Sequence, residues 1–371
     1  MPGSAEQSAT VLTRSRVRIS DLAESLGLTK GTVSRALNDY PDISEATRLR
    51  VRRKAEAMGY RPMAQAQAIR TGRTRALGLV LQADEDGSQQ PFLSDFLEGV
   101  TLAASAENWT TTVAAASPTE EMEAVLNRLV EERKADGFIL PRTRTVDRRA
   151  LLLRKLDVPF VLFGRVQDSD GCAWFDILGE DAMRDAVLRL ARQGHRRIGF
   201  INGSASYFFT VLRDQGFRAG MAQAGLALDE SLILKDAMSR EAGALCTARL
   251  LSHPEPPTAI VFAVDGAALG AYDATEEAGL TIGRDLSIIG YDGIPESRWM
   301  RPALTSFGVD RRMAGARLAG LLLRRIRGEA PETLRETAPA CLQVGGSDGP
   351  PSLTSAQIAA RVARHETQIS S

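Results

Sequence analysis

Residues 19–38 read ISDLAESLGLTKGTVSRALN, and this stretch decides how the N-terminal part of the chain folds. Its apolar residues recur at helical spacing, which predicts two short helices over 21–26 and 30–37. Gly27 permits a tight turn between them, and Thr29 stands where a hydroxyl can accept an otherwise unpaired backbone N–H of the second helix. The stretch therefore predicts a pair of helices joined by a turn.

A third helix is predicted over 45–58, after Ser44, which again occupies a capping position. Ser20 is the expected cap of the first helix. The apolar residues of all three helices are enough for one small shared core. We therefore expect a compact three-helix unit at residues 17–61.

Downstream of residue 75, apolar runs of strand length alternate with helical patterns. The predicted strands are 77–81, 111–115, 137–140, 159–163, 197–201, 259–263 and 286–291. The predicted helices between them are 92–107, 120–134, 181–193, 211–224 and 267–278. Parallel strands need long crossovers, so this alternation predicts an α/β body with parallel, helix-covered sheets. About 270 residues exceed one comfortable sheet, and two doubly wound lobes are expected.

Two segments flank this body, which is predicted to span residues 76–345. Residues 62–75 are too short and polar to form a stable helix alone, and we expect a hinge helix and linker that order against a partner. Residues 346–371 lose the alternating pattern, so a mobile tail is predicted there.

The composition excludes several protein classes. The chain has 371 residues, 44% of them apolar, which rules out a disordered or fibrous protein. No apolar run approaches the ~20 residues that cross a bilayer, and the start lacks a signal sequence. The three cysteines are far apart and fit a reducing compartment. We expect a soluble, cytoplasmic protein without cofactor, metal or membrane contact.

The charge is unevenly distributed. The 46 basic and 46 acidic residues balance over the whole chain, but residues 14–75 hold 14 basic and 6 acidic residues. A short basic module is thus joined to an acidic body. This asymmetry favours a nucleic-acid-binding end, although a basic stretch alone is more often a solvated face.

The stretch 19–38 resembles the helix-turn-helix of the lactose-repressor (LacI) family of bacterial transcription regulators. The resemblance extends to about residue 345 through motifs in the expected order. These motifs are SEATR at 44–48, GYRP at 59–62, RTGRT at 70–74, GHRRI at 194–198, GFR at 216–218, PTA at 257–259, ALGA at 268–271 and IGYD at 289–292.

The resemblance implies a two-lobed body like that of periplasmic sugar-binding proteins, with an effector between the lobes. It places one lobe at about 76–175 and 308–333, and the other at about 176–307 and 334–345. The segments PFVLFGR at 159–165 and WFD at 174–176 look like those of regulators of alpha-glucoside or related sugar-uptake operons.

The residues predicted to face DNA lie on and before the second helix. Arg35 can donate two hydrogen bonds to guanine, and Lys30 is a more flexible donor. Gly31 offers no side chain, so specificity should depend on Lys30 and Arg35; the alternative is that Arg35 only pairs with Asp39. The full set of expected DNA contacts is Thr29, Lys30, Gly31, Thr32, Ser34, Arg35, Asn38 and Ile69.

Ile69 belongs to the hinge rather than to the helix-turn-helix. In the family, two hinge segments enter the minor groove and wedge an apolar residue between base pairs. Ile69 stands where leucine is usual, and Met63 replaces a common asparagine. The alternative is that Ile69 only packs against its dimer mate.

Three residues are predicted to bind the effector because they match family positions near strand ends. Arg213 can hold two neighbouring hydroxyls, and Asp292 and Asp265 follow strands that should end at the cleft. Asp265 follows Val264 where asparagine is frequent. The alternative for Arg213 is pairing with Asp214 or Glu180.

Four further effector-binding candidates are Arg165, Trp174 and Asp176, which lie where the lobes should meet, and Phe208, which could face the ligand. Three of them have a structural alternative. The two aromatic residues could be core, and Asp176 could cap the helix that begins near Leu178.

An enzyme on the same α/β pattern is the rival interpretation. The chain lacks Gly-x-Gly-x-x-Gly after its first body strand, a P-loop and a Gly-x-Ser-x-Gly elbow, and His195 fits a structural role. A repeat scaffold is disfavoured because no repeat is found. We therefore predict a homodimeric DNA-binding regulator that binds a pseudo-palindromic operator and is controlled by a small effector. A sugar is the first choice and a purine the alternative, and induction, corepression and activation stay open.

Overall fold

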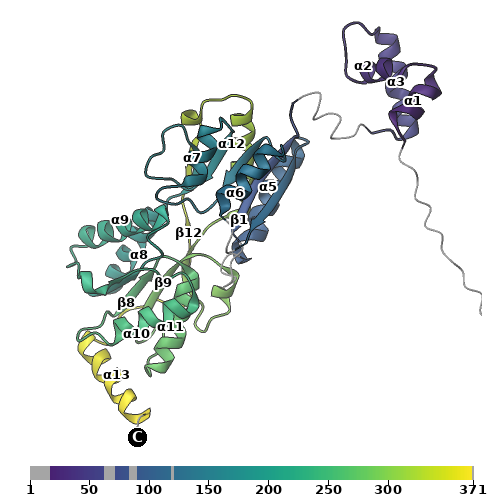
Figure 1. Ribbon diagram of the computed structural model, residues 1–371. Helices are drawn as coiled ribbons and strands as arrows, with labels where there is room; N and C mark the ends of the chain where they lie inside the picture. Colours follow the sequence, from purple (N-terminus) through teal and green to yellow (C-terminus); the bar gives the residue numbers. More distant parts are fainter. Residues whose placement is uncertain (1–16, 62–71, 83–89, 118–120, 370–371) are drawn as a thin grey trace, which may run out of the picture. The chain divides into compact units, whose positions relative to one another are not determined.

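The computed structural model describes residues 17–61, 72–82, 90–117 and 121–369 (Figure 1). Contacts divide the chain into two units, residues 1–74 and 75–371. We call the described part of the first unit the head and the second unit the body, and each is considered separately.

The head is a three-helix unit. Its helices are α1 (Ile19–Leu26), α2 (Lys30–Leu37) and α3 (Glu45–Met58). Leu22, Val33, Ala36 and Val51 are fully buried and form the centre of its core. Each helix contributes to this core, which fixes α2 against the other two helices.

The predicted caps of α2 and α3 are confirmed. The Thr29 hydroxyl accepts the backbone N–H of Thr32 at 3.1 Å, and Ser44 does the same for Thr47 at 3.3 Å. The predicted Ser20 cap is wrong, because α1 begins one residue before Ser20. Instead, the Arg18 backbone N–H donates to Asp21 Oδ2 at 2.9 Å and closes the helix start.

The first lobe of the body, the N-lobe, is built on an all-parallel sheet in the order β11-β5-β4-β3-β1-β2. Its strands are β1 (Ala76–Gln82), β2 (Thr110–Ala116), β3 (Gly137–Leu140), β4 (Phe160–Phe163), β5 (Ala173–Ile177) and β11 (Arg335–Ala338). Its helices are α5 (Gln90–Ala106), α6 (Met122–Glu131), α7 (Arg148–Lys155) and α12 (Arg311–Ile326), with the 3₁₀ turn η3 (Pro331–Thr333) before β11.

The second lobe, the C-lobe, has the sheet order β12-β10-β9-β8-β6-β7, parallel except for β12. Its strands are β6 (Ile198–Ile201), β7 (Ile233–Leu234), β8 (Ala259–Phe262), β9 (Ser287–Asp292), β10 (Thr305–Gly308) and β12 (Cys341–Gln343). Its helices are α8 (Gly179–Gln193), α9 (Phe208–Gln223), α10 (Arg240–Leu251), α11 (Asp265–Glu277) and α13 (Ser355–Ile369), with 3₁₀ turns η1 (Glu230–Leu232) and η2 (Pro295–Arg298). Two doubly wound lobes were predicted, and this fold class is confirmed.

The chain crosses between the lobes three times: after β5, after β10 and after β11. The predicted lobe limits differ at two of these crossings. Residues 176–177 still belong to β5, and residues 335–338, predicted in the C-lobe, form β11 of the N-lobe beside β5. Strand pairing, which local patterns do not reveal, decides both limits.

The predicted mobile tail at 346–371 is wrong for its described residues. Ser347 is fully buried, and its hydroxyl accepts the Thr305 N–H at 2.8 Å. Helix α13 then packs against α10, with Ile358 fully buried and Val362 nearly so (Figure 1). These residues complete the apolar core of the C-lobe.

Close helix packing brings α8 and α9 together beside the cleft. Gly216 of α9 lies directly against the Glu180 carbonyl of α8, where a Cβ would collide with backbone. This contact lets the side chains at the start of α9 approach those at the start of α8. No described helix is long and apolar enough to cross a membrane.

Candidate functional site

Helix α2 presents the residues predicted to read bases on one exposed face of the head. Lys30, Gly31 and Arg35 are exposed, whereas Val33 and Ala36 point into the core. A Cβ at Gly31 would find only Thr29 Oγ1, at 3.7 Å, so the surface is open there. The helix can therefore approach a groove with Lys30 and Arg35 forward.

Arg35 has an intramolecular partner, but not the expected one. Its guanidinium pairs with Asp42 and lies 5.6 Å from the centre of the Tyr40 ring. Asp39, the partner considered from the sequence, instead accepts from Arg52 at 2.5 Å. Both members of the Arg35–Asp42 pair are about half exposed, at 51% and 43%, so the pair costs little to open.

The short polar residues have local bonds as well. Thr32 Oγ1 lies 2.9 Å from Thr29 Oγ1, and the Asn38 amide donates to the Ser34 carbonyl at 2.6 Å. These bonds hold both ends of α2. Ile69 and Met63 lie outside the described residues.

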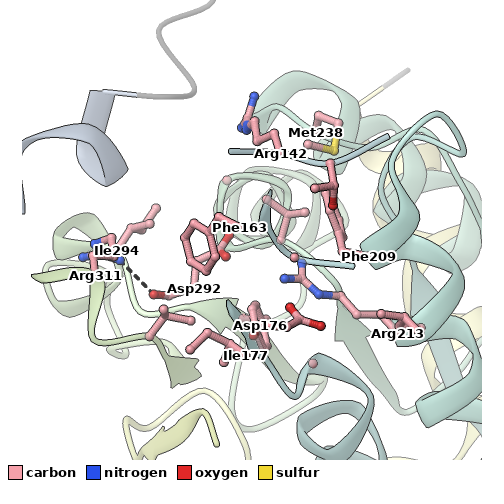
Figure 2. A pocket seen from close by; sticks show the side chains of 18 of the residues that line it. Arg142, Phe163, Asp176, Ile177, Phe209, Arg213, Met238, Asp292, Ile294 and Arg311 are labelled. Carbon is pink, nitrogen blue, oxygen red and sulfur yellow. Dashed lines mark hydrogen bonds between the residues drawn. The ribbon is translucent and has the colours of Figure 1, made fainter. Parts of the chain in front are cut away.

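A cavity of about 360 Å³ lies between the two lobes of the body (Figure 2). It opens where strands of both sheets end, which is the usual ligand position in doubly wound folds. Phe163 comes from the end of β4 and Asp292 from the end of β9, while Arg213 reaches in from α9.

Arg213 is held between two aromatic rings. Its guanidinium carbon lies 3.8 Å from the centre of the Tyr291 ring and 4.3 Å from that of Phe209. The side chain is 8% exposed, and Nη1 donates to the Ala263 carbonyl. This cation–π packing fixes the direction of the guanidinium without neutralising it.

The alternative pairing of Arg213 is wrong. Asp214 accepts from Arg218 at 2.7 Å, and Glu180 accepts from Arg165 at 2.6 Å. Arg213 therefore keeps hydrogen-bonding capacity for a ligand.

Arg165 joins two acids at the wall of the cavity. Its Nε donates to Asp176 Oδ2 at 2.6 Å, and its Nη2 donates to Glu180 Oε1 at 2.6 Å. Burial raises the pKa of Asp176, while the nearby Arg165 opposes this rise. Asp176 does not cap α8, whose N-cap residue is Leu178. Arg165, Asp176 and Glu180 all line the cavity, with one acid strongly desolvated.

Asp292 lies in the cavity with unusual backbone and electrostatic properties. Its φ of 124° lies in a region that disfavours side-chain-bearing residues, and burial raises the pKa of its carboxyl to about 6. Its carbonyl accepts from Arg311 Nη1 at 2.9 Å, the dashed line in Figure 2. Since Arg311 begins α12, this bond joins the lobes across one wall of the cavity.

Four residues that line this cavity each carry a buried polar atom without a hydrogen-bond partner. Among the described residues, two are nitrogen donors, Arg213 Nε and Arg311 Nε, and two are carboxylate acceptors, Glu180 Oε2 and Glu296 Oε2. Such atoms destabilise an empty site, because each has lost water without gaining a partner. The cavity is therefore suited to a ligand that both donates and accepts hydrogen bonds.

Three predicted effector residues do not line the cavity. Asp265 is fully buried below it, where its carboxylate accepts from Gly293 N, Ile294 N, Ser297 Oγ and Ser306 Oγ at 2.8–3.1 Å. It pins the loop after β9 rather than facing a ligand. Trp174 packs against the apolar core of the N-lobe, as its structural alternative proposed.

The third misplaced residue is Phe208. The aromatic residue of α9 that lines the cavity is its neighbour Phe209, since consecutive helical residues point about 100° apart. The sequence interpretation also missed Phe163, Arg142, Glu180 and Arg311. Phe163 and Arg142 lie at or just after strand ends, the signal that could have found them.

His195 lies outside the cavity and holds the C-terminal segment. Its Nε2 donates to the Gly349 carbonyl at 2.8 Å, and its Nδ1 accepts from the Thr258 hydroxyl at 2.8 Å. Burial lowers its pKa, so the neutral ring is favoured. The predicted structural role is confirmed by these contacts.

Comparison with known proteins agrees with both parts of this architecture. Residues 18–63 match the family model of bacterial regulatory proteins of the lacI family, and residues 187–347 match a periplasmic binding protein-like domain. The chain is 35% identical to the HTH-type transcriptional regulator AglR of Rhizobium meliloti (strain 1021), over 90% of this chain and 95% of that one. It is 30% identical to the HTH-type transcriptional regulator RafR of Escherichia coli, over 85% and 94% of the two chains.

A solved structure extends the likeness to the fold. The transcriptional regulator CelR, in a complex with cellobiose, superposes with a TM-score of 0.69 at 27% identity, covering 90% of this chain and all of that one. The relatives are transcriptional regulators rather than enzymes, which excludes the rival enzyme interpretation. Helix-turn-helix head, two-lobed body and extended sequence identity together show that this chain belongs to the LacI family of DNA-binding bacterial transcription regulators.

Proposed function

We propose that this regulator is a homodimeric, cytoplasmic repressor of sugar uptake or catabolism genes, and that a sugar in the interlobe cavity sets its affinity for a pseudo-palindromic operator. The observation that carries the sugar assignment is that four residues lining one cavity, Arg213, Arg311, Glu180 and Glu296, each hold a buried donor or acceptor without a hydrogen bond. Each hydroxyl of a carbohydrate donates one hydrogen bond and accepts others.

The shape and surface of the cavity support the same ligand class. Phe163 and Phe209 offer aromatic surface for the C–H face of a ring, and Arg213 can hold neighbouring hydroxyls. A volume of about 360 Å³ lies in the range of small-molecule sites. The complex of the relative CelR with cellobiose adds a precedent for a sugar in this architecture.

On the head, Lys30 and Arg35 are the proposed base-reading residues. Both are exposed on α2, and neither is needed for the core. Arg35 must leave Asp42 to reach a base, but an exposed ion pair contributes only about 0–1 kcal/mol. Thr29, Thr32, Ser34 and Asn38 would contact phosphates beside them.

The effector would act through the arrangement of the lobes. A ligand that contacts Arg213 of the C-lobe and Phe163 of the N-lobe favours the closed arrangement. Its differential affinity for the two arrangements limits the change in operator binding, and operator must affect the sugar affinity by the same factor.

A two-step experiment tests this function with the full chain. Selection from random duplex DNA should return a pseudo-palindrome that the chain binds as a dimer, with affinity falling steeply as salt increases. Thermal-shift and calorimetric titrations with cellobiose, other di- and monosaccharides and purines should then find a sugar that binds. Addition of this sugar should change the affinity for the operator. A purine as the sole ligand would refute the sugar assignment, and failure to select any DNA motif would refute sequence-specific binding.

A further inference from the structure

Two loops, one from each lobe, meet beside the cavity. One follows β3 in the N-lobe and the other precedes α9 in the C-lobe. The Phe208 N–H donates to the Thr143 carbonyl at 3.1 Å, and the Thr145 N–H donates to the Ser206 carbonyl at 3.0 Å. Residues 143–145 and 206–208 thus form a short antiparallel pairing between lobes, which we call the interlobe clasp.

Both halves of the clasp are held rigidly within their own lobes. In the N-lobe, buried Asp147 accepts from the Arg144 N–H at 3.1 Å and from Arg149 Nη2 at 2.7 Å. In the C-lobe, Asn202 donates to the Thr210 carbonyl at 2.9 Å and accepts the Gly203 N–H at 2.8 Å. The clasp therefore joins two preformed loops.

Tyr207 stands at the centre of the clasp. The guanidinium carbons of Arg142 and Arg144, both from the N-lobe, each lie 5.8 Å from the centre of its ring. On the C-lobe side, the ring stacks on Phe209 with centres 5.5 Å apart and planes inclined by 16°. Phe209 in turn covers the guanidinium of Arg213.

These contacts form a continuous stack from the N-lobe arginines, through the rings of Tyr207 and Phe209, to Arg213 of the C-lobe. Movement of one lobe away from the other must break both the backbone pairing and the cation–π contacts to Tyr207. Displacement of Arg213 or Phe209 by a ligand changes the surface on which Tyr207 rests.

We infer that Tyr207 is a positioning residue that holds the lobes closed over the cavity, and that it couples contacts made at Arg213 to the N-lobe through Phe209. The inference deepens the proposed function and rests on it for the nature of the ligand. Tyr207 itself does not line the cavity, so its effect on the ligand is indirect.

Hydrogen exchange of the full chain without ligand tests the clasp directly. Tyr207→Leu keeps an apolar side chain but removes the π face, and we expect exchange of the N-lobe segment 142–147 to rise about five- to tenfold. Tyr207→Phe retains the ring and should exchange like the native chain. A rise confined to residues 204–209 would overturn the inference, because it would show only a local role.

The reciprocal substitution lies in the other lobe. The double variant Arg142→Met, Arg144→Met should accelerate exchange at residues 204–209 of the C-lobe by a similar factor. Lys155→Met, an exposed change on neighbouring α7, is the matched control and should change neither segment. Native exchange at 204–209 in the double variant would overturn the inference.

A second arm adds each sugar from the screen. A sugar that binds the native chain should slow exchange in both segments, and this slowing should be lost at residues 142–147 in Tyr207→Leu. Equal slowing in both proteins would overturn the coupling. If no sugar binds the native chain, the proposed effector class fails, while the ligand-free experiment still decides the clasp.

Discussion

The guanidinium of Arg213 lies 3.8 Å from the centre of the Tyr291 ring and pairs with neither Asp214 nor Glu180, which bind other arginines. Its charge opposes the rise that burial causes in the pKa of Asp292. Aromatic faces replace a carboxylate as its neighbours. A cation held in this way keeps its direction and can still donate to an incoming oxygen.

Replacement of this arginine should therefore weaken effector binding while preserving the fold. We expect Arg213→Met to weaken the effector about 30- to 100-fold by calorimetry, the size of a lost charged hydrogen-bond pair. Arg218→Met is the matched control five residues later on α9, where the arginine pairs with Asp214 and Glu230. Equal losses in both variants would show that Arg213 has no direct contact with the ligand.

Asp292 should make the stability of the body depend on pH. Its pKa is raised from 3.8 to about 6, so the folded body retains a proton that the unfolded chain releases between about pH 4 and 6. The stability from this group is present below about pH 4 and is lost as the pH rises through 6. As the pH rises from 4.5 to 6.5, the melting temperature of Asp292→Asn should increase by about 2–5 °C relative to that of the native chain, because Asn cannot ionise.

The exposed Asp157→Asn serves as the control for this titration. Its melting temperature should follow that of the native chain throughout the range. Parallel curves for Asp292→Asn and the native chain would contradict the raised pKa.

Asp265 should prove structural. Removal of its carboxylate in Asp265→Ala takes the acceptor from the Ile294 amide and from two buried hydroxyls, and leaves the Gly293 amide with Ser306 Oγ alone. We expect a loss of about 3–5 kcal/mol in the unfolding free energy of the body, measured by urea denaturation. Asp273→Ala, which removes an exposed partner of Arg240, should cost less than about 1 kcal/mol. Normal stability of Asp265→Ala with weakened effector binding would restore the ligand role predicted from the sequence.

The ion pair of Arg35 predicts opposite effects for its two members. Arg35→Met should weaken the selected operator at least tenfold and relax the preference at one base pair, whereas Asp42→Asn should leave affinity unchanged or raise it up to about fivefold. Fluorescence anisotropy against single-base variants of the operator measures both effects. Arg52→Met, which removes a positive charge from α3 rather than α2, should weaken binding to all operator sequences alike. The same uniform weakening in Arg35→Met would show that Arg35 contacts a phosphate and not a base.

Truncation tests the C-terminal segment in two steps. A chain ending at Gly349 loses α13 and exposes the surface that Ile358 and Val362 cover, which should cost about 2–4 kcal/mol. A chain ending at Val344 also removes Asp348, the acceptor of Arg189 and Thr305, and should destabilise the body further. An unchanged melting temperature in both truncated chains would support the mobile tail predicted from the sequence.

The sequence predicted the elements with strong local signals. Helices 30–37 and 45–58 agree with the structure residue for residue, and strand 137–140 does as well. It failed for short strands that pairing defines: the strands β5, β7, β10, β11 and β12, each two to five residues long, were not predicted. Helix α13 was missed because, among its residues with described side chains, two buried residues, Ile358 and Val362, mark its apolar face.

Within the candidate site, the residue types were easier to predict than the directions in which their side chains point. Arg213 and Asp292 lie in the cavity because strand and helix ends limit where they can point. The predictions for Phe208 and Asp265 were wrong because their side chains point away from the cavity. Phe209, one position after Phe208, lines the cavity instead, and Asp265 binds the backbone of the loop after β9. Arg311 could not be found locally, since its partner carbonyl lies in the other lobe.

The late position of β11 and β12 has a consequence during synthesis on the ribosome. The N-lobe sheet stays open beside β5 until residue 338 has emerged, and the C-lobe sheet stays open beside β10 until residue 343 has emerged. The head can fold as soon as residue 60 leaves the exit tunnel, whereas both lobes must wait for the last tenth of the chain with unpaired strand edges. A nascent chain stalled before residue 335 should therefore carry a folded head beside a body that is open to proteases and chaperones.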